Sequence, residues 1–366
     1  MSTTRAIHQL VHTLSYGDAI STEVLALQRT LRGLGFASDV FAIGEHARLR
    51  GRSRPYGEIG SVGDAGLILH YSLGSPLNGI YASWKGGRKI LVYHNITPAR
   101  WFNGVNGRVA RDIEHGLRDL PGLCAASDAL WADSPFNADE LSQMGHRAEV
   151  LDLLVDPERW ERPRNEEIFR AVRASAGVNV LHVGRLAPNK CVEDILKSFH
   201  FFHRHICADS RLWLVGIDTD TELYSFSLRE MAARLGIGHV VELPGCMSDE
   251  GVRAMYEAAS VYVCMSEHEG FCLPLIEAMH FGLPVVAFAA GAVGHTVGDG
   301  GVVLREKRHA DVAQLIGMLS AEGSLRQRVV DAGRRRVEFF SYERFSARVA
   351  DLVSRGSDER RKVQGA

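Results

Sequence analysis

The stretch that decides the fold runs from Val261 to Pro284 and reads VYVCMSEHEGFCLPLIEAMHFGLP. Its first part, Val261–Met265, is short and apolar, which predicts a buried strand. A polar loop follows over Ser266–Cys272, and Pro274 then opens a helix, because proline is favoured at the first helical position. This order predicts a strand–loop–helix unit of an α/β sheet, with the loop at the carboxyl end of the strand.

The same alternation extends outward through the rest of the chain. Further strands are predicted at Ala6–Leu14, Ser38–Ile43, Gly66–His70, Lys89–His94, Ala129–Ser134, Asn179–Val183, Arg211–Val215, Val240–Leu243 and Pro284–Phe288. Helices are predicted at Ala19–Gly33, Arg108–Leu117, Phe136–Gly145, Cys191–His205 and Thr221–Leu235.

The pattern pauses at residues 156–165, DPERWERPRN, a charged and proline-containing stretch that is typical of an interdomain linker. We therefore predict an α/β fold of two tandem Rossmann-like, doubly wound domains that face each other across a cleft. The expected domains are residues 1–160 and 161–340. A terminal helix at 341–354 is free to pack back on the first domain, and the charged residues 355–366 are expected to form a disordered tail.

Composition narrows the class of protein. The chain has 366 residues, 46% of them hydrophobic and 23% charged, and its net charge of −2 gives no field that would attract nucleic acid. The six cysteines form no C-x-x-C pair, so they are expected to be buried apolar residues in a reducing compartment. The sequence shows no signal-peptide pattern and no apolar run of the ~18 residues that a membrane span needs. We expect a cytoplasmic protein; its oligomeric state stays open.

A local basic run, Arg48, Arg50, Arg52 and Arg54, leaves two interpretations open. It is either a solvated loop or a patch that touches anionic lipid or an acidic acceptor. The second interpretation would give peripheral contact with the inner face of the cell membrane.

The loop and helix start after Val261–Met265 predict an anion site. The free backbone N–H groups of Phe271, Cys272 and Leu273 point out of the carboxyl end of the strand, as in other helix N-termini that bind anions. Glu269 precedes them and Glu277 is expected in the first helical turn. Two carboxylates beside an anion site suit a ligand that carries both hydroxyls and phosphate. The alternative is that Glu277 only complements the helix dipole and Glu269 is a solvated loop acid.

A second strand-to-helix turn, VGRLAPNKCV at residues 183–192, contains Arg185 and Lys190. Two cations at such a turn suit a diphosphate. The alternative is a pair of surface cations.

In the N-terminal half, Gly17 lies in a strand-to-helix turn where it permits close backbone approach. His94 ends a predicted strand, which makes it either a site residue or a structural histidine. His200, His203 and His205 share a helix, but no carboxylate or cysteine completes a ligand set, so no metal site is predicted.

Two motifs together resemble a known family. G-R-L-x-x-x-K at residues 184–190 and E-G-F-x-L-P-x-x-E-A at residues 269–278 resemble the retaining family-4 glycosyltransferases of GT-B fold. Glu269 and Glu277 match the E-x7-E motif of that family. One departure is Cys191, which stands where the family usually has glycine and leaves the path of this turn open.

The resemblance implies a role for each candidate residue. The N-terminal domain would bind the acceptor and the C-terminal domain the nucleotide sugar. Arg185 and Lys190 would hold the donor diphosphate, and Glu277 the ribose hydroxyls. Glu269 would contact the transferred sugar. The remaining implied contacts are backbone groups of Gly270 and Phe271 to sugar hydroxyls, amides of Cys272 and Leu273 to phosphate, Gly245 and Met247 around the base, Gly17 facing the diphosphate and acceptor, and His94 near the transferred sugar.

The function implied by the resemblance is that of a retaining, metal-independent hexosyltransferase without a cofactor. Its donor substrate would be GDP-mannose or a UDP-hexose. Its acceptor would be a sugar or a lipid-linked glycan in the synthesis of envelope polysaccharide or glycoconjugate. Two alternatives stay open: a transferase that makes a small soluble glycoside, and a non-transferring GT-B protein such as a sugar-nucleotide epimerase.

Overall fold

The computed structural model describes residues 5–364, which divide into two compact units. The first unit contains the residues up to Pro98, Arg111–Asp156 and the chain from Ser341 onward. The second contains Ala99–Ala110 and Pro157–Phe340. The main boundary therefore lies after Asp156, four residues before the predicted one.

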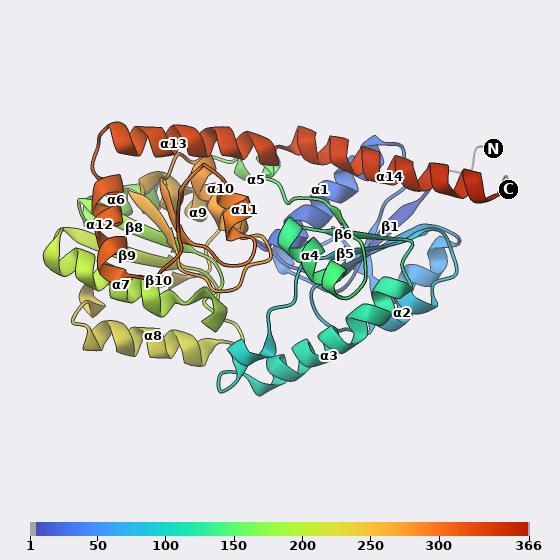
Figure 1. Ribbon diagram of the computed structural model, residues 1–366, viewed down its shortest axis with the longest axis horizontal. Helices are drawn as coiled ribbons and strands as arrows, with labels where there is room; N and C mark the ends of the chain where they lie inside the picture. Colours follow the sequence, from blue (N-terminus) through green and yellow to red (C-terminus); the bar gives the residue numbers. More distant parts are fainter. Residues whose placement is uncertain (1–4, 365–366) are drawn as a thin grey trace. The chain divides into compact units, whose positions relative to one another are not determined.

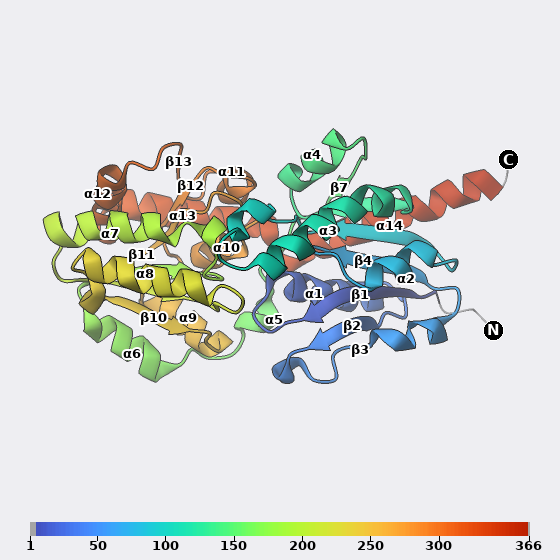
Figure 2. The same ribbon diagram turned by 90° about the horizontal axis from the view of Figure 1, so that it is seen from below.

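The first unit is built on a seven-stranded parallel sheet of order β3-β2-β1-β4-β5-β6-β7. Its strands are β1 Ile7–Leu14, β2 Val40–Glu45, β3 Arg54–Pro55, β4 Gly66–Tyr71, β5 Lys89–Tyr93, β6 Ala129–Ala132 and β7 Glu149–Val150. Its helices are α1 Ala19–Gly33, α2 Leu77–Ser83, α3 Gly107–Ala125, α4 Pro135–Gln143 and α14 Tyr342–Gln364. Helices α1 and α14 cover one face of this sheet, and α2 and α3 cover the other (Figures 1 and 2).

The second unit has a six-stranded parallel sheet of order β10-β9-β8-β11-β12-β13. Its strands are β8 Val178–Val183, β9 Ser210–Val215, β10 Val241–Gly245, β11 Val261–Cys264, β12 Val285–Phe288 and β13 Val302–Leu304. Its helices are α5 Pro157–Trp160, α6 Glu166–Ser175, α7 Val192–His205, α8 Glu222–Arg234, α9 Asp249–Ala258, α10 Leu273–His280, α11 Val293–Val297, α12 His309–Ser320 and α13 Ser324–Val337. The two parallel sheets confirm the predicted fold class.

Short 3-10 helices join these elements. They are η1 Ala47–Leu49, η2 Tyr56–Val62, η3 Ala99–Phe102, η4 Pro188–Lys190, η5 Gly238–Val240 and η6 Glu338–Phe340. The basic run predicted from the sequence falls on η1 and β3, where Arg54 pairs with Asp39 at 3.2 Å and with Glu58 at 3.0 Å.

The terminal helix α14 completes the core of the first unit. Its Phe345, Val349 and Leu352 pack in one buried cluster with Ile68 and Trp131 of the sheet. The helix does not stop near residue 354: it continues to Gln364, so residues 355–364 are helical where we predicted a disordered tail. An ion pair one turn apart, from Asp351 to Arg355, supports the helix at the first residue of the predicted tail. The last two residues of the predicted tail lie outside the described residues.

Among the described residues, every helix is too short or too polar to cross a lipid bilayer.

Candidate active site

The candidate site lies where the order of strands in the second sheet reverses, between β8 and β11. Strands β8 and β11 are parallel neighbours. The strand after β8 lies on one side of this pair, and the strand after β11 lies on the other. Open α/β sheets bind ligands at such a reversal, outside the carboxyl ends of the strands. The loops after β8 and β11 carry the two predicted motifs, so both motifs meet at this edge.

Asn189 joins the loops after β8 and β11 through two hydrogen bonds. Its backbone carbonyl accepts a hydrogen bond from the N–H of Glu267 at 2.9 Å. Its side-chain amide donates to the carbonyl of His268 at 3.1 Å. The residues that flank Asn189 and His268, which are Lys190 and Glu269, are thereby brought face to face.

Lys190 and Glu269 form a buried ion pair. The Lys190 ammonium donates to both carboxylate oxygens of Glu269 at 2.8 Å. Burial would raise the pKa of Glu269, but the Lys190 charge and hydrogen bonds from Ser266 and Cys272 hold it below its usual value. Burial likewise opposes the charge on Lys190, and Glu269 overcomes it and raises the lysine pKa. Both groups therefore stay charged inside the protein.

The backbone of Glu269 is held as firmly as its side chain. Its carbonyl accepts from the N–H of Ala292 at 2.9 Å. Gly291, at φ +54°, makes this approach possible, since a Cβ there would lie 2.3 Å from the same carbonyl oxygen. The Phe271 carbonyl is also occupied, by the Thr296 hydroxyl at 2.5 Å. The Phe271 backbone was predicted to contact a sugar hydroxyl, but its carbonyl already accepts a hydrogen bond from within the protein.

Helix α10 begins one residue earlier than expected, at Leu273, with Cys272 as its N-cap in the left-handed region at φ 75°. The Cys272 side chain makes no capping hydrogen bond. Glu277 consequently lies in the second turn, not the first as predicted, because the helix counts from Leu273. A dipole effect confined to the first turn therefore explains Glu277 poorly.

Glu277 belongs to a buried polar network that the sequence did not predict. One carboxylate oxygen accepts from Arg159 Nη1 at 2.5 Å, and the other accepts from the Tyr256 hydroxyl at 2.9 Å. Arg159 also donates from Nε to Asp249 at 2.8 Å. Arg159 lies in α5, inside the stretch predicted to be a linker, and its charged environment there gave no signal of burial.

Arg185 is not brought into contact with this ion pair. Its guanidinium donates to the Thr219 carbonyl at 2.8 Å and lies 5.9 Å from the ring centre of Phe102. Burial lowers the pKa of Arg185, although Asp220 and Glu222 counteract this. Among the contacts of the described residues, none joins Arg185 to Lys190 or Glu269.

Cys191 resolves the path of the turn after Lys190. It adopts φ 47° and ψ 47°, the left-handed region, and directly precedes α7. This is a conformation that glycine adopts without strain. The turn thus keeps a glycine-like backbone although the residue is cysteine.

Gly245 ends β10 at φ 79°. Its carbonyl accepts from the N–H of Gly216 at 3.1 Å. Because β9 separates β10 from β8 in the sheet, Gly245 and the half-buried Met247 lie at the same edge but two strands away from Lys190.

His182 is a site residue that sequence reasoning missed. Its Nδ1–H donates to the Val263 carbonyl at 3.0 Å, which leaves Nε2 as an acceptor. Burial lowers the pKa of His182 to about 4, so the ring is neutral at neutral pH. Within the described part of the chain, Nε2 has no hydrogen-bond partner. A histidine inside the apolar run VNVLHV was the available signal.

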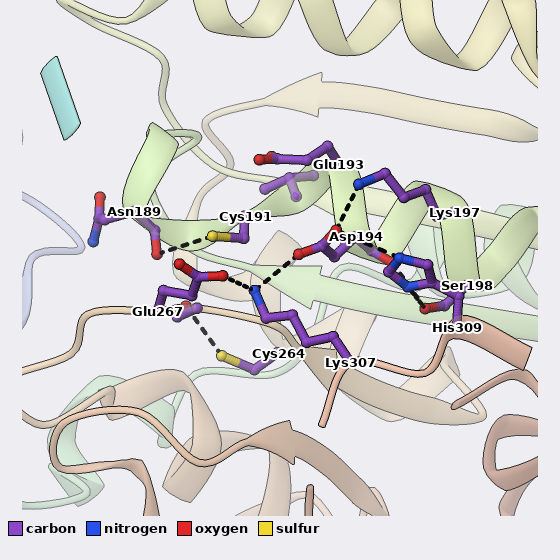
Figure 3. A network of polar contacts seen from close by, with 12 residues as sticks. Asn189, Cys191, Glu193, Asp194, Lys197, Ser198, Cys264, Glu267, Lys307 and His309 are labelled. Carbon is purple, nitrogen blue, oxygen red and sulfur yellow. Dashed lines mark hydrogen bonds and ion pairs between the residues drawn. The ribbon is translucent and has the colours of Figure 1, made fainter. Parts of the chain in front are cut away.

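Lys307, also missed, joins three segments of the second unit. Its ammonium donates to Asp194 of α7 and to Glu267 of the β11 loop, both at 2.8 Å. Figure 3 shows Lys307 between these carboxylates, with Lys197 and His309 on the far side of Asp194. This network holds the loop that carries Glu269 against the start of α7.

In the first unit, Gly17 follows β1 at φ 76°, and Asp18 caps α1 by accepting from the N–H of Ser21 at 3.1 Å. His94 follows β5, but its side chain is fully buried. Its Nδ1 lies 2.9 Å from Asp133 and its Nε2 lies 2.8 Å from His70. Both ring nitrogens therefore have partners within the unit. This is the arrangement expected of a structural histidine, the second of the two interpretations that the sequence left open.

A second buried carboxylate, Glu23 of α1, lies 3.4 Å from His94 Nδ1. Burial and the nearby Asp133 raise the pKa of Glu23 to about 8. Burial would lower the pKa of His94, but Asp133 and Glu23 raise it to about 9. The sequence did not reveal this cluster, because a glutamate on an amphipathic helix usually faces solvent.

Comparison with known proteins identifies the family of the chain. A sequence model of the family described as "Glycosyl transferases group 1" matches residues 164–336. A D-inositol 3-phosphate glycosyltransferase of Streptomyces coelicolor is 32% identical over 78% of this chain and 67% of its own length. The chain belongs to the group 1 glycosyl transferases.

Two further glycosyltransferases are similar over a smaller share of their length. A D-inositol 3-phosphate glycosyltransferase of Streptomyces bingchenggensis is 31% identical over 66% of this chain. An MMP alpha-(1->4)-mannosyltransferase of Mycolicibacterium hassiacum is 31% identical over 70% of this chain. The matched region spans 57% and 58% of these two relatives, respectively.

Solved structures share the GT-B fold. Sucrose-phosphate synthase from Thermosynechococcus elongatus superposes with a TM-score of 0.75 at 17% identity, over 96% of this chain and 98% of that one. Anabaena Alr3699/HepE, solved in complex with UDP and glucose, gives a TM-score of 0.67 at 17% identity, over 96% of this chain and 99% of that one. The fold of this group 1 glycosyl transferase is therefore two parallel-sheet α/β domains of GT-B type.

Proposed function

We propose that this chain is a retaining, metal-independent hexosyltransferase that takes its sugar from a nucleoside-diphosphate donor. The observation that carries the proposal is the buried Lys190–Glu269 ion pair, at the reversal point of the sheet and beside the start of α10. A diphosphate needs fixed positive groups, and a hexose needs a carboxylate that accepts from its hydroxyls. The two requirements meet in one pair of side chains.

Lys190 is able to bind phosphate without giving up Glu269. An ammonium group has three N–H donors, and the two contacts to Glu269 leave one for a phosphate oxygen. The amides at the start of α10 add donors and a favourable dipole. Arg185 supplies a second cation, since its present partner, the Thr219 carbonyl, carries no net charge that would compete with phosphate.

Glu277 suits the ribose of the donor. Arg159 and Tyr256 each use one lone pair of its carboxylate and so fix its orientation. A carboxylate oxygen has two lone pairs, so one on each oxygen is left for a vicinal diol. The network thus preorganises the group rather than blocking it.

The transfer step requires stabilisation of the departing nucleoside diphosphate. In the proposed front-face route, a phosphate oxygen of the leaving group deprotonates the acceptor hydroxyl while the sugar passes through an oxocarbenium-like state. Lys190, Arg185 and the start of α10 offset the negative charge that develops, so fixed cations perform the task that a divalent metal performs elsewhere. Glu269 orients the sugar throughout.

For the donor, we propose GDP-mannose or a UDP-hexose. The relatives include a mannosyltransferase, and Alr3699/HepE was solved with UDP and glucose. For the acceptor, the names of the relatives that act on D-inositol 3-phosphate favour a small phosphorylated polyol over a lipid-linked glycan. A lipid-linked acceptor would favour exposed aromatic side chains near the site, but beside Arg100 the ring of Phe102 is buried and that of Trp101 is half-buried.

A thermal-shift screen of UDP-, GDP- and ADP-sugars tests the proposal, because a ligand raises the unfolding temperature in proportion to its affinity. Transfer from the donor so identified is then assayed with inositol 3-phosphate and with a lipid-linked sugar as acceptors. Lys190→Ala should abolish most transfer, and Lys197→Ala, which removes a neighbouring partly exposed lysine, serves as the control. Equal transfer by both variants, or no stabilisation by any donor, would refute the proposal.

A further inference from the structure

Two thiols and a carboxylate meet in the loop after β11. Cys264 is the last residue of that strand and Cys272 is the N-cap of α10. Their sulfur atoms lie 3.9 Å apart. One ligand atom from each of Cys264, Cys272 and Glu269 lies within 4.8 Å of the other two, and all three residues are buried. The polar atoms therefore converge on one small volume.

The spacing of the sulfurs fits a tetrahedral metal site. With Zn–S bonds of about 2.3 Å, two thiolates on one zinc ion lie about 3.8 Å apart. The observed separation of 3.9 Å matches this edge without movement of the backbone. The hydroxyl oxygen of Ser266 lies 3.3 Å from Cys264 Sγ, so a further oxygen is available beside the three ligands.

Charge balance also permits a cation here. The ammonium of Lys190 already neutralises Glu269, and two thiols in their protonated form would add no charge. Binding of a divalent cation requires both thiols to lose their protons. The entering charge of the ion equals the charge of the two protons that leave, so the buried group keeps its net charge and avoids the cost of burying a new one.

The neighbouring group of Cys191, Asp194 and Glu267 lacks these properties. It contains one thiol, and the Lys307 ammonium already contacts both of its carboxylates at 2.8 Å (Figure 3). Lys190 contacts the Glu269 carboxylate in the same way, so the difference between the two groups is the second thiol, which a zinc–thiolate site uses. The comparison favours the two-thiol group as the metal site.

We propose that Cys264, Cys272 and Glu269 form a binding site for a thiophilic divalent cation such as Zn²⁺, and that the bound cation competes with the donor sugar for Glu269. The site has three protein ligands, the number found in zinc sites whose fourth ligand is not supplied by the protein. The competition rests on the proposed function, whereas the metal site itself does not. The cation is thus an inhibitor of the donor site and no part of the reaction.

The metal site is tested by titration of the full-length, fully reduced protein with Co²⁺ and Zn²⁺. Co²⁺ should give the thiolate-to-cobalt charge-transfer absorption of a tetrahedral thiolate site, and Zn²⁺ should bind in one equivalent against a chromogenic chelator. Cys264→Ala and Cys272→Ala should each weaken Zn²⁺ binding more than about 100-fold, beyond the loss of an outer-shell partner. Cys207→Ala, which removes a thiol outside the cluster, should bind as the wild type does.

Two results would overturn the metal site. One is Co²⁺ binding without charge-transfer absorption, which needs no variant and so does not depend on how the variants fold. The other is wild-type Zn²⁺ affinity in the Cys264→Ala, Cys272→Ala double variant.

The competition is tested by calorimetry with the nucleotide sugar, with and without buffered Zn²⁺. Zn²⁺ should weaken donor binding about tenfold or more in the wild type, an effect of about 1.4 kcal/mol or more. It should leave donor binding by Cys264→Ala unchanged. Equal donor affinity in the wild type with and without Zn²⁺ would disprove the competition. Absence of donor binding even without Zn²⁺ would refute the proposed function and the competition with it, while the cobalt spectra would still decide the metal site.

Discussion

The ammonium group of Lys190 contacts Glu269 and, in the proposed reaction, the phosphate of the donor. In the described structure it neutralises Glu269, whose side chain is only 7% exposed. During the proposed reaction it also faces the phosphate. Loss of the lysine would therefore affect the fold and the chemistry separately, because an uncompensated buried carboxylate is costly whether or not a substrate is present.

We predict that Lys190→Ala lowers kcat/KM for transfer by about 10² to 10³, the range for a lost oxyanion-type contact. It should also lower the free energy of unfolding by about 3 kcal/mol, the lower end for a buried pair that loses one partner. Denaturant unfolding of Lys190→Ala, Glu269→Gln separates the two effects: stability should return and activity should not. A double variant that stays as unstable as the single one contradicts the pairing.

Cys191 provides a test of backbone conformation. A non-glycine residue in the left-handed region costs roughly 1–2 kcal/mol. We therefore expect Cys191→Gly to be about 1 kcal/mol more stable than Cys191→Ala, in urea unfolding, although both lose the sulfur. At Cys124, inside helix α3, the order should reverse, because glycine is the poorer helix former. The same order at both positions would show that Cys191 is not strained.

At the scale of elements, α5 and α10 depend on each other through Arg159. Its guanidinium spans Glu277 of α10 and Asp249 of α9. Its ring partner Trp160 packs edge-on against Phe281, 5.1 Å between centres, just beyond α10. Arg159 is thus a positioning residue: it touches no substrate in our proposal and acts by orienting the carboxylate of Glu277.

We predict that Arg159→Ala raises the donor KM about tenfold or more and changes kcat less, because the ribose contact is disturbed and the phosphate contacts are not. Arg159→Lys should recover only part of the affinity, since an ammonium cannot reproduce the fork that reaches both carboxylates. Calorimetry with the nucleoside diphosphate measures the effect directly. A variant with normal donor KM and reduced kcat would assign Arg159 another role.

Most elements of the fold could be predicted from sequence, because periodicity reports burial. Helix α1 was predicted to the residue, and the structure shows Asp18 as its N-cap. The two-residue edge strands β3 and β7, the three-residue β13 and the short α5 were missed, since so few residues carry no period. The longer helices α6, α12 and α13 were not predicted either. For the site, the motifs identified Lys190 and Glu269. The contacts that orient the site could not be predicted, because a long-range contact such as that of Arg159 with Glu277 leaves no local pattern in the sequence.

At the scale of the whole molecule, each unit has its own sheet and its own buried polar cluster. The cluster of the first unit joins α1, β4, β5 and β6 through Glu23, His70, His94 and Asp133. Raised pKa values of about 8 for Glu23 and about 9 for His94 mean that the folded unit holds protons that the unfolded chain releases. The stability of this unit is therefore linked to pH.

We predict that the first unit loses stability as pH rises from about 6 to 9. The contribution of each raised group is complete below its unfolded pKa, 4.5 for Glu23 and 6.5 for His94, and is lost as pH passes about 8 and 9, respectively. Glu23→Gln should match the wild type near pH 4, below the unfolded pKa of Glu23, and exceed it at pH 9 in denaturant unfolding, because the amide never ionises. Glu58→Gln, on an exposed pair, is the control. A wild-type curve that is flat over this range would exclude the linkage.

The return of the chain to its first unit constrains how the protein is made. A ribosome synthesises every strand of the first sheet long before Phe345, Val349 and Leu352, which cover its Ile68 and Trp131. The face that α1 and α14 share is therefore covered by α1 alone during translation of the entire second unit, when aggregation and chaperone capture compete with folding. Final assembly of the first unit must wait until translation has passed α14.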